Sequence, residues 1–106
     1  GTVTANSDGL YIKELDITLV QLDQTTAETL GIDTSTSGIL VKTVGENNKN
    51  LMVNDVIIQV SSEKIIDLPS FEKMLSDSLK LKRDKLLLRV IREGNEFWLI
   101  NPLFIE

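Results

Sequence analysis

Apolar residues recur along most of this chain at the spacings typical of strands and helices. Leu15, Ile17 and Leu19 alternate with polar residues, which predicts a strand with one buried face. A run over 96–101 predicts the second strand of a hairpin, which Pro102 ends. Other β-branched and apolar runs predict further strands, over residues 39–44, 53–60 and 86–92.

Two segments carry helical signals. Residues 25–30 are long enough for one or two helical turns and are followed by Gly31, a residue that commonly ends helices. Residues 68–79 place apolar side chains at helical spacing, and Asp67 can cap this helix at its N-terminus. The intervening polar segments predict turns or loops, over 33–38, 45–50 and 61–64.

The order of elements is strand, short helix, several strands, long helix and hairpin. Strands and helices do not alternate regularly, which disfavours a doubly wound parallel sheet and indicates an α+β fold. We expect a five- to six-stranded antiparallel β-sandwich or partly open barrel capped by two helices. Residues 1–9 are small and polar and predict an N-terminal linker or tether, so the domain is expected to occupy 10–106.

Composition excludes several kinds of chemistry. The 106 residues suit one domain, and they include no cysteine and no histidine. The chain therefore lacks cysteine- or histidine-based catalytic and metal sites, and we expect no catalytic residues, metals or cofactors. A formal charge of −5 lacks the basic footprint of a nucleic-acid-binding protein. No apolar run reaches the roughly 18 residues that a membrane span requires.

One spacing resembles a catalytic motif. Ser70 and Lys73 match the S-x-x-K pattern of some serine acyl-transferases and would share a helix face. The other motifs that this class requires are missing, so the two residues are interpreted as part of a polar helix face. The chain by itself is therefore predicted not to be an enzyme.

The apolar stripe on the first strand admits two interpretations. Leu15, Ile17 and Leu19 could face Leu68 and Leu75 of the long helix across a groove that accepts an extended peptide. They could equally pack directly into a filled core. The residues alone favour the filled core.

Several motifs, taken in order, resemble a known family. LDQTTAETLGI at 22–32 and GILVKTV at 38–44 resemble consecutive segments of PDZ domains in HtrA/Deg-like (Do-like) serine proteases. LMVNDVIIQV at 51–60 resembles the PDZ signature L-R-P-G-D-V-I-L-x-V. The groove helix and the closing hairpin of the family are matched by residues 67–75 and 86–99. The resemblance implies a PDZ-like fold over nearly the whole chain.

The resemblance also implies a peptide-binding groove. In the family, backbone N–H groups of the loop before the second strand bind the C-terminal carboxylate of a peptide. The peptide adds as a strand between that second strand and the long helix. Carried over by position, the peptide-binding residues are Lys13, Glu14, Leu15, Asp16, Ile17, Thr18 and Leu19 on the strand side and Leu68, Glu72 and Leu75 on the helix side.

Two positions depart from the family pattern. Asp16 stands where glycine is usual, and it brings a side chain and a negative charge to the carboxylate-binding loop. Lys13 would offset part of this charge and Glu14 would add to it. Asn54 replaces the glycine before Asp55, and asparagine tolerates the left-handed backbone that such a turn needs.

Two functions follow from the resemblance. The first is a module that captures C-termini or extended hydrophobic segments of unfolded proteins by β-strand addition. The alternative is an assembly or regulatory module with a weak or occluded groove, which docks on other domains or subunits of the same protease. In both cases the resemblance implies a parent serine endopeptidase of protein quality control, located in the periplasm or otherwise outside the cytoplasm.

Overall fold

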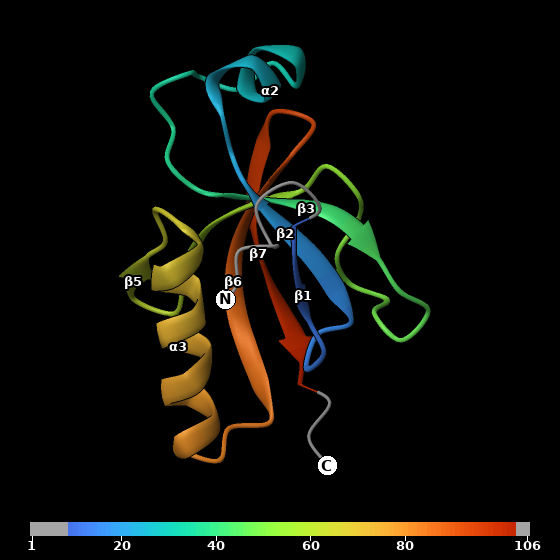
Figure 1. The fold of residues 1–106 in the computed structure, drawn as a ribbon, viewed down its shortest axis with the longest axis vertical. Helices are drawn as coiled ribbons and strands as arrows, with labels where there is room; N and C mark the ends of the chain where they lie inside the picture. Colours follow the sequence, from blue (N-terminus) through green and yellow to red (C-terminus); the bar gives the residue numbers. More distant parts are fainter. Residues whose placement is uncertain (1–8, 104–106) are drawn as a thin grey trace.

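The computed structural model describes residues 9–103, so the predicted tether lies outside the described residues except for Gly9. No helix in that range is long and apolar enough to cross a membrane. In chain order (Figure 1) the elements are β1 (Leu10–Ile12), β2 (Ile17–Gln21), α2 (Gln24–Thr29), β3 (Ile39–Val44), β4 (Val56–Val60), β5 (Glu63–Lys64), α3 (Leu68–Lys80), β6 (Lys85–Arg92) and β7 (Asn95–Pro102).

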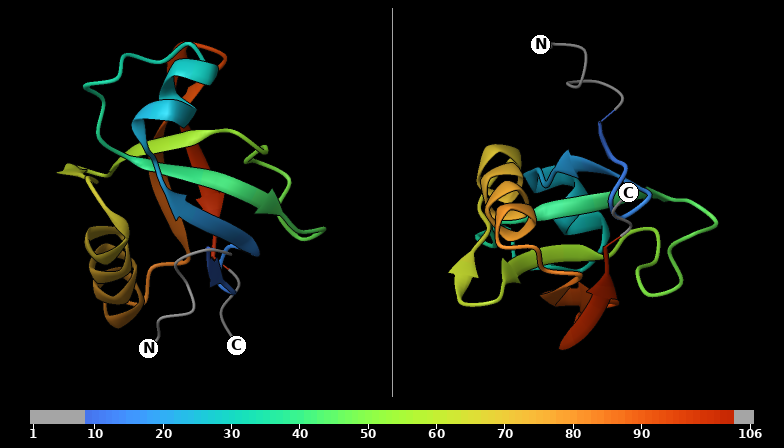
Figure 2. Two further views of the ribbon diagram at one scale, coloured as in Figure 1. Left: turned by 45° about the horizontal axis from the view of Figure 1, so that its top comes forward. Right: turned by 90° about the horizontal axis from the view of Figure 1, so that it is seen from below.

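The strands of the described part form one antiparallel sheet in the order β1-β2-β3-β4-β6-β7, and β5 pairs with β4. The predicted α+β class is confirmed. The sheet has seven strands instead of five or six, because β1 and β5 are short strands of three and two residues. β5 falls within the segment 61–64, which was expected to be only a turn. Figure 2 shows α3 beside the sheet and α2 at one end of it.

The N-terminus of α3 explains the S-x-x-K spacing. The Ser70 N–H donates to Oδ1 of Asp67 at 2.9 Å, and the Ser70 hydroxyl accepts from the Asp67 N–H at 3.2 Å. These two bonds form a reciprocal capping box. Nζ of Lys73 lies 3.1 Å from Asp77, one turn further along the helix. Ser70 therefore caps the helix, and Lys73 belongs to its polar face.

The strand predicted over 53–60 starts later than expected, at Val56. Asn54 has φ of 77°, the left-handed conformation that the sequence led us to expect at this position. The Asp55 N–H donates to the Met52 carbonyl oxygen at 3.1 Å, and Oδ2 of Asp55 accepts from the Met52 N–H at 2.8 Å. The turn made by these bonds occupies the residues that apolar spacing alone assigns to the strand.

Two apolar clusters hold the sheet and the helices together. In the larger one, Phe71 and Leu75 of α3 pack on the inner face of the sheet, and Phe71 is completely buried. The smaller cluster lies under α2, where Ala27 packs against Leu40, Val56 and neighbouring side chains. Apolar burial of this kind supplies most of the stability of a small domain.

A buried ion pair joins the β4 turn to the closing hairpin. The Asp55 side chain is 1% exposed, and Arg92 donates to both of its oxygens, at 2.8 Å from Nε and 2.7 Å from Nη2. The Arg92 guanidinium also donates to the Asn50 carbonyl oxygen at 3.1 Å and lies over the Phe97 ring. The hydrogen bond to Asp55 raises the pKa of Arg92. Arg92 thus compensates the only charge that the described core contains.

Replacing Arg92 with methionine is expected to lower the free energy of unfolding by about 2–3 kcal/mol, because the Asp55 carboxylate would be left buried without its partner. Urea unfolding followed by circular dichroism measures this change. Arg83→Met removes an exposed arginine instead and should cost less than about 0.5 kcal/mol. Equal stability of the two variants would show that the ion pair does not support the hairpin.

Candidate functional site

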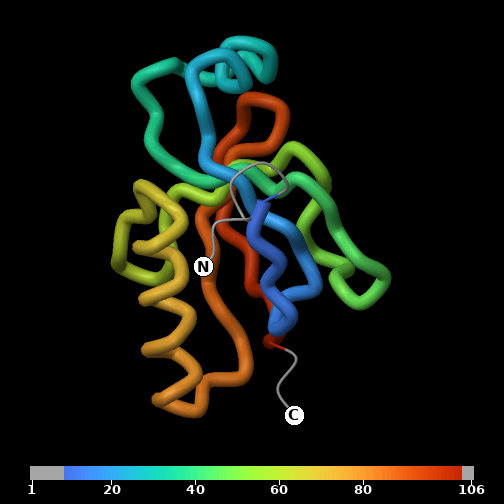
Figure 3. Tube along the Cα trace, viewed as in Figure 1, coloured from blue at the N-terminus to red at the C-terminus, as the bar shows by residue number. Residues whose placement is uncertain are grey.

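The two edges of β2 are both occupied by strands of the same chain. One edge pairs with β3. The other edge pairs with β1, which runs antiparallel to β2 with Leu10 opposite Leu19 and Ile12 opposite Ile17. The chain makes this reversal within residues 13–16, as the path of the tube in Figure 3 shows. The edge that the family resemblance assigns to a bound peptide therefore holds β1.

The structure brings the predicted apolar groove residues together in one cluster. Leu15, Ile17 and Leu19 are completely buried and share the main core with Leu75, which is 7% exposed. Leu68 packs against the same cluster, and its N–H donates to the side chain of Gln21 at 3.3 Å. The filled-core interpretation of the β2 stripe is thus confirmed.

The side chain of Ile12, which the sequence did not single out, completes this cluster. It is 5% exposed and packs in the main core from the outer edge of β2. The Ile12 carbonyl oxygen accepts the Leu15 N–H at 3.2 Å. Leu15 belongs to the loop whose N–H groups are expected to bind a carboxylate, so one of these donors already has an acceptor.

Three charged members of the predicted site, Lys13, Glu14 and Glu72, lie around a hollow of about 370 Å³ between β1 and α3, and Asp16 does not line it. Lys13 is exposed and Glu14 half-buried on the hairpin side, and Glu72 is exposed on the helix side. We call this space the β1–α3 hollow. It is lined by Leu10, Tyr11, Ile12, Lys13, Glu14, Glu72, Leu75, Ser76 and Leu79. Thr18 does not line it.

Asp16, at the position where the resemblance leads us to expect glycine, has a left-handed backbone. Its φ is 55°, in the left-handed region, and its carbonyl oxygen accepts the Gly45 N–H at 2.8 Å. Its carboxylate accepts from the Tyr11 hydroxyl at 2.7 Å and from the Asn47 N–H at 3.1 Å. A Cβ on Gly45 would collide with this carboxylate, so a larger residue at position 45 would force the Asp16 side chain to move.

These bonds shift the acidity of both partners. The hydrogen bond from Tyr11, followed by the one from the Asn47 N–H, lowers the pKa of Asp16. The same hydrogen bond to Asp16 raises the pKa of Tyr11. The bond between them is therefore complete at neutral pH. It is lost in acid as Asp16 protonates and in strong base as Tyr11 ionises.

Asn48 is a structural member of the site that sequence reasoning missed. Its side chain is buried and donates to the Leu15 carbonyl oxygen at 2.8 Å and to Asn101 at 3.1 Å. Its own oxygen accepts the N–H groups of Asn50 and Leu51, each at 2.9 Å. Asn48 stands within a polar run that resembles any exposed loop, so no local signal marks its burial.

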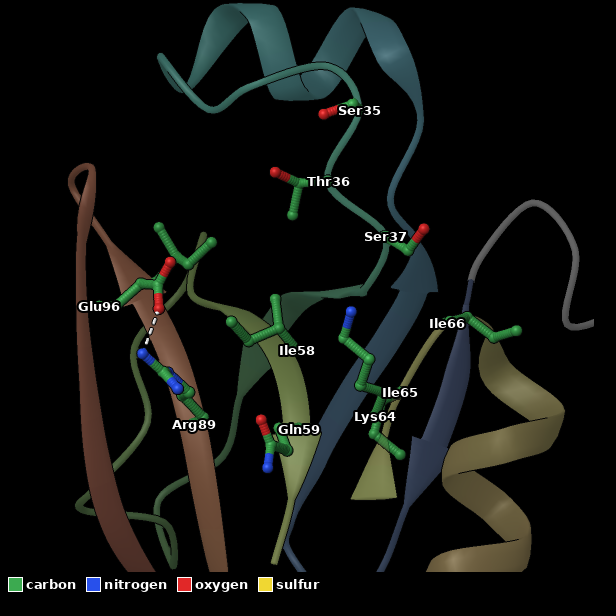
Figure 4. Close-up of a pocket in the computed structure, with 11 residues that line it drawn as sticks. Ser35, Thr36, Ser37, Ile58, Gln59, Lys64, Ile65, Ile66, Arg89 and Glu96 are labelled. Atoms are coloured by element: carbon green, nitrogen blue, oxygen red, sulfur yellow. Dashed lines mark ion pairs between the residues drawn. The ribbon is translucent and has the colours of Figure 1, made fainter. Parts of the chain in front are cut away.

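A second hollow, of about 390 Å³, lies away from the predicted groove, between the β6–β7 hairpin and the loop before β3 (Figure 4). Arg89 points into it and binds Oε1 of Glu96 at 2.8 Å. The Arg89 guanidinium also lies over the ring of Trp98, 5.4 Å from its centroid. Nη2 of Arg89 is thus paired within the hairpin, whereas its buried Nε has no hydrogen-bond partner among the described residues. This hollow shares no lining residue with the β1–α3 hollow.

Comparison with known proteins supports the fold. No protein-family model matches the sequence, and no curated protein matches it. Solved structures do match. One is the crystal structure of the HtrA3 PDZ domain bound to a phage-derived ligand, FGRWV, with a TM-score of 0.62 and 20% identity over 85% of this chain and 84% of that one. At this identity the likeness establishes the architecture, and the chain has the PDZ fold.

Replacing Tyr11 with phenylalanine is expected to raise the pKa of Asp16 toward its ordinary value of about 3.9, because the strongest hydrogen bond to the carboxylate is removed. An NMR titration of the side-chain carboxyl carbons measures this change.

Asp23 provides the internal reference for this titration, since its pKa is lowered by the Thr26 N–H at the N-terminus of α2. In both proteins the value for Asp23 should stay the same. Because folding lowers the pKa of Asp16, its contribution to stability is present above its unfolded pKa and is lost as pH falls through the folded value. An unchanged pKa of Asp16 in the variant would mean that Tyr11 does not bind it in solution.

Proposed function

We propose that this chain is a peptide-binding PDZ module that holds extended apolar segments by strand addition at the β2 edge, beside α3. The observation that carries the proposal is the way this edge is occupied. It already holds an extended segment that runs antiparallel to β2 and buries one aliphatic side chain, that of Ile12, in the cluster formed with Leu15 and Leu75. Strand addition to a sheet edge uses the same geometry.

The similar solved structure supports an aliphatic residue in the ligand of this chain. The HtrA3 PDZ domain was crystallised bound to the phage-derived ligand FGRWV, which ends in valine. Valine and isoleucine are both β-branched, so Ile12 is similar in shape to the last residue of that ligand. We propose that this chain prefers an aliphatic residue at the position of Ile12. Backbone bonds to β2 would supply most of the affinity, and the pocket around Ile17 would supply the preference.

The loop offers limited means of recognising a terminal carboxylate. Lys13 is exposed and can approach a negative group, whereas Glu14 repels one. The Asp16 carboxylate is turned toward Tyr11 and the Asn47 N–H, which neutralise part of its field. We therefore propose capture of extended segments as the main activity, with a free C-terminus as an additional and smaller contribution.

We also propose that the module serves a longer HtrA/Deg-like serine protease located in the periplasm or otherwise outside the cytoplasm. The motifs over 22–32 and 51–60 support this placement. The partners would be unfolded or C-terminal peptide segments and other domains or subunits of the parent. The catalytic residues would come from elsewhere in that protein, because this chain contains no histidine or cysteine.

The occupied edge also supports an assembly role as a second candidate. A groove filled by β1 leaves the outer surfaces of the domain to make contacts with neighbouring subunits. This candidate predicts that deleting the domain from the parent reduces the oligomer size and leaves peptide affinity unchanged. The peptide-binding proposal predicts the opposite pattern.

A titration of the 15N-labelled chain tests the peptide-binding proposal directly. The probe is a pentapeptide with the sequence of residues 8–12, DGLYI, with a free C-terminus in one form and an amide in the other. We expect chemical-shift changes in β2 and on the α3 face of Leu75 with both forms, and about threefold weaker binding of the amide, since one charged contact is lost. Absence of chemical-shift changes with both forms at millimolar concentration, in this chain and in a variant whose β1 is displaced from β2, would contradict the proposal.

A matched pair of variants places the binding site. Ser76 lines the β1–α3 hollow and is exposed, so Ser76→Phe fills the hollow without disturbing the core. Lys80→Phe adds the same side chain at an exposed position of α3 that does not line the hollow. Ser76→Phe should reduce the affinity for DGLYI at least tenfold, and Lys80→Phe should leave it unchanged. Equal effects would show that the peptide binds elsewhere.

A further inference from the structure

We infer that residues 9–12 form an autoinhibitory strap that occupies the peptide-binding edge of β2 and must leave it before a peptide can bind. This inference rests on the proposed function and names its regulation. The strap consists of Gly9 and the three residues of β1. It lies on the edge of β2 opposite β3, where an added strand would lie.

The strap makes the contacts expected of a ligand. It runs antiparallel to β2, with its C-terminal end at the loop over residues 13–16. Its last residue, Ile12, puts its side chain into the main cluster and its carbonyl oxygen on the Leu15 N–H. A peptide seated on the same edge needs the same pocket and the same donor. The strap and the peptide are therefore mutually exclusive.

The strap is attached weakly compared with the rest of the sheet. It pairs with β2 through three residues, whereas β6 and β7 pair through eight. Tyr11 is 58% exposed, and its hydroxyl donates to the Asp16 carboxylate, which is itself on the surface. Segments with few buried contacts open at a lower free-energy cost than the global unfolding of the protein. Release of the strap is thus possible while the core remains folded.

The strap and a free peptide compete for the same residues of β2. Within the described residues, β1 pairs with Ile17, Thr18 and Leu19. The strap has the advantage of being joined to its site, which gives it a high effective concentration. A free peptide binds only the open fraction, so its apparent affinity falls by that fraction.

Gly9 provides a specific way to loosen the strap. A Cβ at this position would lie 2.7 Å from Cγ2 of Thr18 and 2.8 Å from the Leu19 carbonyl oxygen. The backbone there has φ of 92°, which residues other than glycine rarely adopt. Gly9→Ala should push the strap away from β2 and leave the core residues untouched. Gly94→Ala is the matched control, because Gly94 has φ of 82° and no other atom would lie within 4 Å of an added Cβ.

The first measurement compares the two variants with the parent chain. Amide exchange at Tyr11 and Ile12 and the affinity for the free-acid DGLYI peptide are both recorded by NMR. In Gly9→Ala we expect faster exchange in the strap and about tenfold tighter peptide binding, since the open fraction grows. Gly94→Ala should match the parent in both measurements. Faster exchange with unchanged or weaker peptide affinity would overturn the inference.

The second measurement locks the strap in place. Tyr11 and Thr18 are directly opposed on β1 and β2, and such pairs bring Cα atoms to about 4.5–5.5 Å, a separation that a disulfide can span. The chain has no cysteine of its own, so Tyr11→Cys combined with Thr18→Cys gives a single disulfide. The oxidised form should not bind DGLYI, and reduction should restore binding.

The outcomes separate the two proposals. If the oxidised form binds DGLYI as tightly as the reduced form, the autoinhibition proposal is wrong. The peptide would then bind at a surface that the strap does not cover. Absence of binding in the reduced form and in Gly9→Ala, despite fast amide exchange in the strap, would instead reject the peptide-binding function. The autoinhibitory role of residues 9–12 would then be rejected together with the peptide-binding function.

Discussion

The reversal of the chain between β1 and β2 is the constraint on which the site depends. Four residues return the chain on itself, and Asp16 ends the turn in a left-handed conformation held by the Gly45 N–H. From the other side, the buried amide of Asn48 fixes the Leu15 carbonyl oxygen. With these two adjacent residues held at the end of the turn, Leu15 and Ile17 lie completely buried in the core.

This arrangement has a physical advantage for a domain with a binding edge. An unoccupied edge strand presents unpaired backbone groups, which favour association with other chains. The apolar side chains of Ile17 and Leu75 would add an exposed patch if nothing covered them. A short segment of the same chain satisfies these groups and covers the apolar surface. The protection is local, and its strength is set by three residues and not by the whole core.

Much of the fold could be predicted from the sequence. The Asp67 cap and the closing hairpin are local signals that led to the correct elements. The alternation at Leu15, Ile17 and Leu19 predicted β2, although Leu15 lies in the turn before it. The start of β4 was misplaced because the turn at Asn54 interrupts an apolar run whose spacing still looks like a strand. Local spacing does not show where a backbone leaves the extended conformation.

The site was less predictable because its features depend on contacts between distant segments. Asp16 was interpreted as a departure from a carboxylate-binding loop, whereas its partners, Tyr11 and Gly45, show that it closes a hairpin. The burial of Asn48 requires Asn101, more than fifty positions away. The role of Ile12 could not be predicted from the sequence, because it depends on which edge of β2 its strand pairs with. Leu15, Ile17 and Leu19 are packed in the core, and β1 covers the edge of β2 that the resemblance assigns to a peptide.

The position of the single tryptophan determines what an optical experiment on this domain can detect. Trp98 is 44% exposed on β7, at the end of the sheet opposite β1, where it packs against the Arg89 guanidinium. Its fluorescence therefore reports the integrity of the hairpin and the loss of the fold. Occupancy of β2, which lies four strands away in the sheet order, would leave the emission unchanged. A fluorescence titration without a change in emission would therefore carry no information about occupancy of the β2 edge.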